Sequence, residues 1–322
     1  MKKIAISIGD LNGIGLEIAL KAHNEVKELC NPIYCINETM LQWGAAMLGV
    51  DVAVDFETKE CGENFEITPG VATKSSGEFS YDSFITAIAL AKSKLVDAVV
   101  TLPINKKSWA LAELSYKGHT DALADLFDEE MIMMLGCDKL YTILFTHHIP
   151  LKKVSDCIKT KNLTRFLVKA YDHLRINKIG VLGLNPHAGD DGVLGDEEEK
   201  IRKAIKKANE LLDKNIFFGP LVPDTSFTKN SLEKCKHFVC MYHDQGLIPL
   251  KTLYFEKSVN ITLNSFIIRT SVDHGTAYDI AYKRKNPSIK SYINAIKEAV
   301  KMVENKPILD FFIHTKYIKL LV

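Results

Sequence analysis

The sequence predicts an α/β fold with a mostly parallel sheet, and three observations favour it. Short apolar runs alternate along the chain with longer segments of helical periodicity, which is typical of parallel strands covered by helices on both faces. The apolar runs end repeatedly in glycine or polar residues, at the position where ligands bind in such sheets. A length of 322 residues leaves room for a large core and for two lobes.

The chain opens with an alternating strand at residues 3–8, a turn that contains Gly9, Gly13 and Gly15, and a helical pattern over residues 16–29. A strand, a glycine-rich turn and a helix form the outline of a nucleotide-binding unit. The spacing differs from the Rossmann fingerprint, because no third glycine lies three residues after Gly15. A tight turn is therefore the simpler interpretation of these glycines.

The remaining elements continue this alternation. Residues 57–77 are polar and rich in turn-forming residues, so we expect a surface excursion there. The apolar runs at 131–135 and 141–145 indicate two neighbouring strands that start a second lobe. Asp196 to Glu199 fill the first turn of a helix, where acids complement the helix dipole rather than form a metal site. The other strands are predicted at residues 32–36, 52–56, 97–100, 179–184 and 238–240, and the other helices at residues 39–48, 81–91, 122–127, 163–174, 201–212, 276–283 and 287–304.

The composition disfavours several classes of protein. The formal net charge is +1, so no broad field attracts nucleic acid or an acidic membrane surface. No apolar run is long enough to span a bilayer, and the first residues are too short an apolar stretch for a signal peptide. We therefore expect a cytoplasmic protein. Its seven cysteines contain no Cys-x-x-Cys pair, which is typical of free thiols.

Three histidines follow apolar runs that are predicted to be strands. His148, His187 and His243 each stand where a strand ends and a turn begins. Three imidazoles with one open position form the catalytic type of zinc site, and cobalt, nickel or iron also accept such ligands. Any single histidine is more often structural or exposed. The histidines that lack supporting neighbours in the sequence are His23, His173, His237 and His314.

A second group of residues suggests an anion site. Thr120 or Asp121 is expected to cap the helix at 122–127, and free N–H groups at a helix N-terminus bind anions. His119 beside them is a plausible contact, although an ordinary cap with a surface histidine is the simpler explanation. Downstream, Lys251, Asn260 and Arg269 supply two cations and an amide; a buried cation needs a partner, and a phosphate or carboxylate would serve. Asp224 lies in a turn-rich loop near the third predicted strand end.

At this point the residues show a close resemblance to a known family. From about residue 4 to residue 303, in the family's order, the chain resembles the 4-hydroxythreonine-4-phosphate dehydrogenases of vitamin B6 biosynthesis. The strings that carry the resemblance are Gly118-His119-Thr120, His148-Ile149-Pro150-Leu151, Gly183-Leu184-Asn185-Pro186-His187-Ala188-Gly189, Met241-Tyr242-His243-Asp244-Gln245-Gly246 and Arg269-Thr270-Ser271-Val272-Asp273-His274-Gly275-Thr276-Ala277.

The resemblance implies a fold like that of isocitrate and isopropylmalate dehydrogenases, with two α/β lobes and a central cleft. The first lobe would consist of residues 1–128 and 264–322, and the second of residues 129–263. The second lobe would contain the metal ligands and the interface of a homodimer whose active site draws on both subunits. The superfamily binds NAD or NADP without a Rossmann fingerprint, in agreement with the spacing at Gly13.

The resemblance also implies roles for individual residues. His148, His187 and His243 match the family's ligands for a divalent ion, such as zinc, magnesium or cobalt. The substrate contacts would be His119, Thr120, Lys251, Asn260 and Arg269. The cofactor segment would be His274, Gly275, Thr276 and Ala277. Asp224 and Lys251 are the two candidates for the catalytic base.

Some positions depart from the family's pattern. Leu11, Asn12 and Leu16 replace proline, alanine and proline in the opening motif, and Asn264-Ser265-Phe266 replaces Gly-Leu-Pro. Tyr282-Lys283-Arg284 stands where Gly-basic-Gly is usual, on the expected adenine side of the cofactor. Residues 307–322 extend past the usual end of the family's chains.

The implied reaction is oxidation of 4-phosphooxy-L-threonine at C3 by NAD, followed by loss of CO₂ to give 3-amino-2-oxopropyl phosphate. One alternative is a sister oxidative decarboxylase that acts on another hydroxy acid, such as a threonate. A second is a metal-dependent hydrolase or lyase that uses the three histidines without redox chemistry. A non-catalytic interaction protein ranks last, because it would not need three convergent imidazoles together with Lys251 and Arg269.

Overall fold

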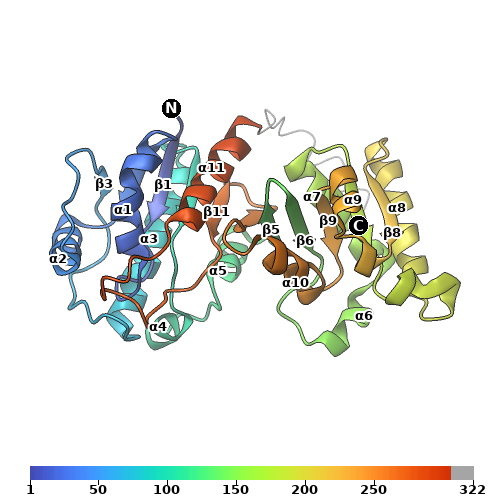
Figure 1. The fold of residues 1–322 in the computed structure, drawn as a ribbon, viewed down its shortest axis with the longest axis horizontal. Helices are drawn as coiled ribbons and strands as arrows, with labels where there is room; N and C mark the ends of the chain where they lie inside the picture. Colours follow the sequence, from blue (N-terminus) through green and yellow to red (C-terminus); the bar gives the residue numbers. More distant parts are fainter. Residues whose placement is uncertain (306–322) are drawn as a thin grey trace. The chain divides into compact units, whose positions relative to one another are not determined.

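The computed structural model describes residues 1–305 of the chain, which divide into two compact units (Figure 1). Unit 1 consists of Met1–Met131 and Glu256–Asn305, and unit 2 of Ile132–Phe255. The first predicted boundary between the lobes, after residue 128, lies three residues before the observed boundary after Met131. The second, after residue 263, lies eight residues after the observed boundary at Phe255. The predictions for residues 307–322 lie outside the described part.

The sheet of unit 1 has the strand order β3-β2-β1-β4-β11-β10. All neighbouring strands in it are parallel except β10 and β11, which are antiparallel. This pairing explains why residues 256–263, expected in the second lobe, belong to unit 1. The predicted mostly parallel α/β architecture is confirmed. The strands are β1 (Lys3–Ser7), β2 (Asn31–Cys35), β3 (Thr58–Lys59), β4 (Ala98–Thr101), β10 (Val259–Leu263) and β11 (Arg269–Val272).

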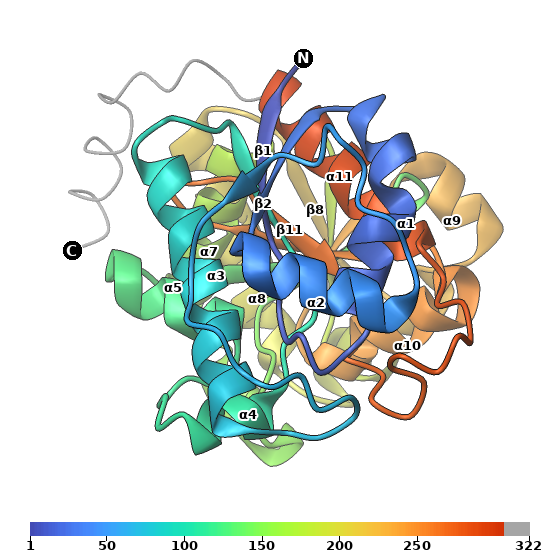
Figure 2. The ribbon, with the colours of Figure 1, turned by 90° about the vertical axis from the view of Figure 1, so that its left-hand side faces the viewer.

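Helices cover both faces of this sheet, as Figure 2 shows, with α1 and α11 on one side and α3 on the other. Their ends follow ordinary capping chemistry. Asn37 accepts a hydrogen bond from the backbone N–H of Met40 at the start of α2, and Gly49 ends that helix in the left-handed conformation. The helices of unit 1 are α1 (Gly15–Lys27), α2 (Glu38–Leu48), α3 (Lys74–Lys92), α4 (Lys106–Leu111), α5 (His119–Phe127) and α11 (Lys290–Glu304).

Three sequence predictions in unit 1 were wrong in part. The surface excursion ends earlier than residue 77, because the Thr73 hydroxyl accepts from the N–H of Ser76 and starts α3 there. Residues 52–56 form no strand, and only β3 follows them. Residues 276–283 form turns instead of a helix, with Ala277 and Tyr282 at positive φ.

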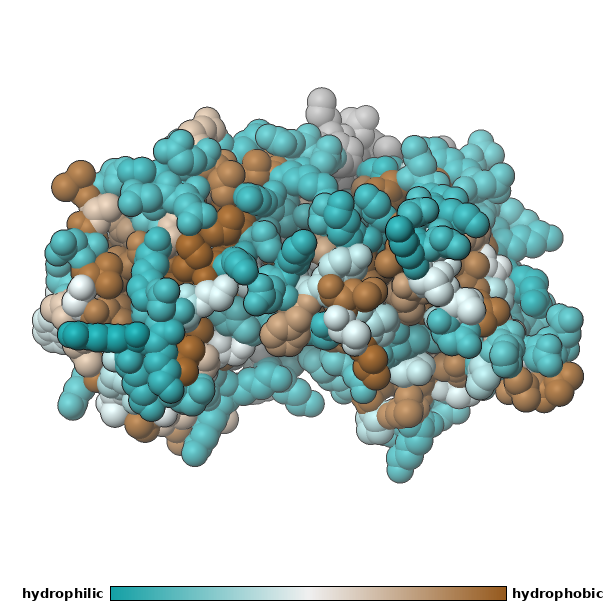
Figure 3. Space-filling view, in the orientation of Figure 1, coloured by the Kyte–Doolittle hydropathy of each residue, from teal (hydrophilic) through white to brown (hydrophobic). Residues whose placement is uncertain are grey.

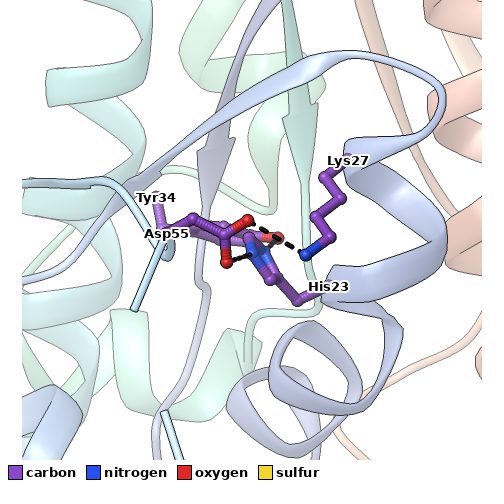
Figure 4. A network of polar contacts seen from close by, with 4 residues as sticks. All are labelled: His23, Lys27, Tyr34 and Asp55. Atoms are coloured by element: carbon purple, nitrogen blue, oxygen red, sulfur yellow. Dashed lines mark hydrogen bonds and ion pairs between the residues drawn. The ribbon is translucent and has the colours of Figure 1, made fainter. Parts of the chain in front are cut away.

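His23, which had no apparent partner in the sequence, is a buried structural histidine. Its Nδ1 lies 3.0 Å from the hydroxyl of Tyr34 and its Nε2 lies 3.1 Å from a carboxylate oxygen of Asp55. Lys27 donates to the other oxygen of Asp55, as Figure 4 shows, and this lysine is the main reason why the pKa of Asp55 is lowered. The network fixes the segment between α2 and β3 to α1.

Unit 2 has the strand order β5-β6-β9-β7-β8, in which only β5 and β6 are antiparallel. The predicted pair of neighbouring strands at its start is confirmed. Strands β5, β6 and β7 are buried along their whole length, as expected for a sheet that is covered on both faces. The strands are β5 (Ile132–Cys137), β6 (Leu140–Leu144), β7 (Ile179–Leu182), β8 (Phe217–Leu221) and β9 (His237–Cys240).

One face of the unit 2 sheet is covered by α10, whose Leu247 and Leu250 join a core with Met133 and Phe238. Helices α7 and α8 pack against each other on the other face (Figures 1 and 2). The helices of unit 2 are the 3₁₀ turns η1 (Leu151–Lys153), η2 (Pro186–Gly192) and η3 (Pro223–Thr225) and the α-helices α6 (Val154–Cys157), α7 (Thr160–Leu174), α8 (Glu197–Leu212), α9 (Lys229–Lys234) and α10 (His243–Tyr254).

On the face drawn in Figure 3, hydrophilic side chains are spread over both units, and hydrophobic ones form small separate patches. In the described residues, none of the helices combines the length and the apolar character needed to cross a membrane.

Candidate functional site

The three predicted metal ligands lie in unit 2 at the carboxyl ends of neighbouring strands. Strands β6, β9 and β7 run parallel and adjacent, so the segments that follow them emerge at the same edge of the sheet. His148 follows β6, His243 begins α10 after β9, and His187 lies in η2 after β7. The rings of His148 and His243 are 5.7 Å apart between centroids.

Hydrogen bonds tie these strand ends to one another. The Thr146 hydroxyl donates to the carbonyl oxygen of Met241 over 2.7 Å, which joins the segments of His148 and His243. Gln245 accepts from the Met241 N–H and donates from Nε2 to the carbonyl oxygen of Gly183, each over 2.7 Å. Because Gln245 is buried, these two bonds hold the His243 turn beside the strand that leads to His187. Its role was not predicted from the sequence.

His187 is exposed and starts a run of five residues with positive φ that ends at Asp191. In residues 1–305, no three His, Cys, Asp or Glu side chains lie together as a group that would hold a metal ion. The structure therefore brings two of the predicted ligands together and leaves His187 apart. An imidazole nitrogen binds zinc at about 2.0–2.1 Å, so ligands of one ion must be close neighbours, as His148 and His243 are. The imidazole donors present fit a divalent ion of the zinc or cobalt type.

The two candidate bases are also in unit 2. Lys251 lies two turns after His243 on α10, and its ammonium nitrogen is 5.2 Å from the centre of the Phe255 ring. Asp224 lies in η3 and is exposed.

Unit 1 contains a buried basic cluster made of His119, Asn260 and Arg269 with the hydroxyls of Thr101 and Thr262. Asn260 and Thr262 lie two residues apart on β10, and Thr262 pairs with Arg269 on the adjacent β11. The Arg269 guanidinium donates to Thr262 Oγ1 over 3.0 Å and to Thr101 Oγ1 over 2.7 Å. The two threonines were missed in the sequence, because threonine is common in strands and gives no separate signal.

This cluster carries positive charge without a negative partner in the described part of the chain. Burial lowers the pKa of Arg269 to about 9, so the group is still protonated at neutral pH. Its Nε, the Nε2 of His119 and the Oδ1 of Asn260 are buried and have no hydrogen-bond partner there. Burial, and secondarily the charge of Arg269, lower the pKa of His119 well below its usual value. A neutral His119 and a charged Arg269 thus offer donors to an anion.

Helix α5 adds backbone donors beside this cluster. It begins at His119 after Gly118, and no side chain caps it. The predicted cap at Thr120 or Asp121 was therefore wrong: both residues lie inside the first turn, and Asp121 instead accepts from the N–H of Lys117. Uncapped N–H groups at a helix N-terminus favour anions. Thr120, which is half-buried, lies at this N-terminus as predicted.

The predicted cofactor segment, His274 to Ala277, is fixed against the glycine-containing turn that follows β1. The carbonyl oxygen of Thr276 accepts from the N–H of Ile14 over 3.1 Å, and a side chain at Gly13 would come within 2.8 Å of Thr276. Gly275 has open space around it, and the buried Nε2 of His274 has no hydrogen-bond partner in residues 1–305. An unpartnered imidazole nitrogen beside open backbone fits a polar ligand.

Two tyrosines that follow this segment bind the same turn, which explains why no helix forms at residues 276–283. The hydroxyl of Tyr278 donates to Asp10 Oδ2 over 2.8 Å, and that of Tyr282 donates to the carbonyl oxygen of Leu11 over 2.8 Å. Asp10 is buried and also accepts from Ser76 and Ser108. Burial raises the pKa of Asp10 despite these bonds. Tyr282 is the first of the three residues, 282–284, at which the sequence departs from the family's usual pattern.

Comparisons with known proteins identify the family of this chain. A family model described as pyridoxal phosphate biosynthetic protein PdxA matches residues 28–299. A 4-hydroxythreonine-4-phosphate dehydrogenase from Sulfurimonas denitrificans is 55% identical over 302 residues, which cover 94% of this chain and 98% of that protein. One from Campylobacter fetus is 55% identical over 94% of this chain and 99% of its own length.

A solved structure extends the similarity from sequence to fold. The crystal structure of a 4-hydroxythreonine-4-phosphate dehydrogenase from Klebsiella pneumoniae has a TM-score of 0.82 and 32% identity, and the match covers 94% of this chain and 100% of that one. The strand-end histidines and the buried basic cluster thus stand on a chain that matches its relatives almost from end to end. By these matches the chain belongs to the family of the pyridoxal phosphate biosynthetic protein PdxA.

Proposed function

We propose that this chain is a 4-hydroxythreonine-4-phosphate dehydrogenase that acts in pyridoxal 5′-phosphate biosynthesis. The substrate, 4-phosphooxy-L-threonine, and NAD would give 3-amino-2-oxopropyl phosphate, CO₂ and NADH. The observation that carries the proposal is the 55% identity to dehydrogenases of this name over 94% of the chain. The buried, unpaired cation Arg269 supports it, because a phosphorylated substrate supplies the missing negative charge.

The basic cluster would hold the anionic end of the substrate. Arg269 has a guanidinium suited to two parallel hydrogen bonds with a phosphate or carboxylate. Neutral His119 donates without adding a second buried charge, and Asn260 and Thr120 supply further polar contacts. These groups are fixed by strands and by the start of α5, so they orient the substrate without a large rearrangement.

His148, His187 and His243 would hold the divalent ion, and residues 274–277 would contact the nicotinamide cofactor, NAD or NADP. When bound, the ion supplies Lewis-acid chemistry at the C3 oxygen, and the nicotinamide accepts the hydride. The side chain of Lys251 or Asp224 would take the proton of the C3 hydroxyl. Lys251 is favoured, because it lies on the same helix as His243 and is only partly exposed.

We also propose a homodimer. Helix α10, which carries His243 and Lys251, exposes the large apolar side chains of Ile248 and Leu253, and the exposed Phe255 follows directly after it. Exposed apolar groups clustered on one helix are typical of protein–protein interfaces. A second copy on this helix would lie next to the ligands, which agrees with an active site that draws on two subunits.

The deciding experiment follows NADH absorbance with synthetic 4-phosphooxy-L-threonine, with and without a chelator. We expect NADH and CO₂ to form in equal amounts and the chelator to stop both. Turnover of a threonate but not of the phosphorylated substrate would favour a sister decarboxylase. Conversion of the substrate without any NADH would favour a metal-dependent hydrolase or lyase, and would refute the proposal.

A further inference from the structure

The turn that carries His187 is anchored to a buried carboxylate. The acids in the first turn of α8 were expected to complement the helix dipole, and one of them, Glu198, is buried, with only 4% of it exposed. Its Oε1 accepts from the backbone N–H groups of Leu184 and Asn185, each over 2.8 Å, and its Oε2 accepts from Asn185 Nδ2 over 2.9 Å. Three N–H donors from two consecutive residues thus converge on one side chain.

Residues on both sides of His187 in the sequence lie against the Glu198 carboxylate. Leu184 and Asn185, which donate to Glu198, precede the histidine. Gly189 follows it and lies so close to the carboxylate that a side chain there would come within 2.6 Å of Glu198 Oε2. A side chain at Gly183 would come within 3.1 Å of Glu198 Oε1. The space around the carboxylate is therefore filled by the backbone of the His187 turn.

The turn needs such an anchor because its own backbone is unfavourable. Residues from His187 to Asp191 all have positive φ, a conformation that costs free energy for residues with a side chain. The bonds to Glu198 fix the residue pair that enters this run. Without them, the turn would relax toward ordinary backbone angles and carry His187 with it.

A second acid links the same turn to the segment after His148. Asn185 Nδ2 also donates to Glu197 Oε2 over 2.8 Å, and Glu197 Oε1 accepts from the hydroxyl of Ser155 in α6. These bonds are the main cause of the lowered pKa of Glu197. Asn185 therefore connects two acids of α8 and, through Ser155, two of the three segments that carry the predicted ligands.

We propose that Glu198 is a positioning residue for the metal site: it fixes the turn that carries His187, so that this histidine, which a single chain leaves apart from His148 and His243, can complete the ligand set of the ion in the homodimer. The inference rests on the proposed function, because it assumes that the three histidines bind one divalent ion. Second-layer residues of metal sites typically change metal affinity about 10–100-fold when replaced. Glu198 touches no predicted ligand directly and acts through the backbone.

The test replaces Glu198 with Gln, which keeps the shape but puts an NH₂ group against N–H donors. Glu199→Gln is the matched control: it removes the same charge one residue away, from a side chain that is 65% exposed and pairs with Lys203. Binding of Co²⁺ alone is measured by its visible absorption and by competition with a chelator, and thermal unfolding of the metal-free protein is measured in parallel.

We expect Glu198→Gln to weaken Co²⁺ binding about 10–100-fold and to change the ligand-field spectrum, whereas Glu199→Gln leaves both as in the wild type. Asn185→Ala, which keeps both backbone bonds to Glu198, should give a smaller loss and guards against misfolding of the first variant. Lower unfolding temperature with unchanged Co²⁺ affinity and spectrum would show a purely structural role and overturn the inference.

The outcome separates this inference from the proposed function. A wild-type chain that produces NADH and binds Co²⁺, with Glu198→Gln equal to it in affinity, refutes the inference alone. A wild-type chain that binds no divalent ion refutes both.

Discussion

The guanidinium of Arg269 donates to the hydroxyl of Thr101 over 2.7 Å, at a position where a buried cation would ordinarily meet a carboxylate. A hydroxyl satisfies the hydrogen bond but leaves the charge uncompensated. Taking a charge out of water costs several kcal/mol unless it is paired. The free protein therefore bears a cost at Arg269 that a bound anion would offset.

This contact predicts that Arg269→Met weakens anion binding without lowering the stability of the free protein. The free variant should be as stable as the wild type or more stable, because an apolar side chain of similar length replaces an unpaired buried charge. Inorganic phosphate should raise the unfolding temperature of the wild type but not of the variant, and kcat/KM should fall at least about 100-fold, as expected when a charged hydrogen bond worth roughly 3 kcal/mol is lost.

Arg175→Met serves as the control, because Arg175 belongs to unit 2 and forms an ion pair with Asp172. It should keep the response to phosphate. A large drop in stability of Arg269→Met together with an intact phosphate response would contradict the assignment of the anion site.

The same arginine predicts a pH dependence. Its folded-state pKa of about 9 lies below its ordinary value of 12.5, so the unfolded chain binds more protons between these values and the stability of the free protein rises with pH across that window. Anion binding should change in the opposite sense, because it needs the charged guanidinium. The dissociation constant for phosphate, measured by calorimetry, should increase above about pH 9; a flat profile up to pH 10.5 would contradict this.

A second titration concerns Asp10 and the predicted cofactor segment. Burial raises its pKa above the ordinary value of 3.8, so the folded chain binds more protons than the unfolded chain above that pH. Stability should therefore fall as the pH rises through the raised pKa. Asp10→Asn removes this titration and should flatten the curve of unfolding free energy against pH.

Urea unfolding between pH 4 and pH 8 measures this difference. Asp138→Asn is the control, because Asp138 is exposed and pairs with Lys139; it should keep the wild-type slope. If Asp10→Asn keeps that slope as well, another group is responsible for it.

Much of the fold followed from the sequence, because local signals and tertiary packing agree in it. The apolar runs of β1, β4 and β9 are buried strands, and the apolar period at Ile201 and Ala208 gives the inner face of α8. The predicted helix at 276–283 failed because the tyrosines that supply its apolar period instead donate to Asp10 and Leu11, more than 260 residues away in sequence. Such long-range bonds leave no local signal.

The candidate site was predictable to a similar extent. Position at the ends of strands was enough to single out His148 and His243, whose rings are neighbours. The supporting residues could not be predicted in this way, because Glu198 and Gln245 look like ordinary helix-surface residues until their partners are known. Their role depends on which backbone groups the fold brings to them.

The ring contacts around His148 predict a contrast between two adjacent histidines. His147 lies 5.1 Å from His148 between ring centroids, and the ring contact with His243 is made by His148. His148→Ala and His243→Ala should each lower Co²⁺ affinity by more than the roughly 10–100-fold expected for a supporting residue, and should abolish NADH formation.

His147→Ala is the matched control, because it removes an imidazole of equal donor strength from the neighbouring position. It should keep stoichiometric metal and most of the activity, since His147 is not one of the predicted ligands. The measurement is metal content after dialysis together with initial rates. If His148→Ala kept the metal and His147→Ala lost it, His147 would be the ligand instead of His148, because the ion loses a ligand only when the residue that binds it directly is removed.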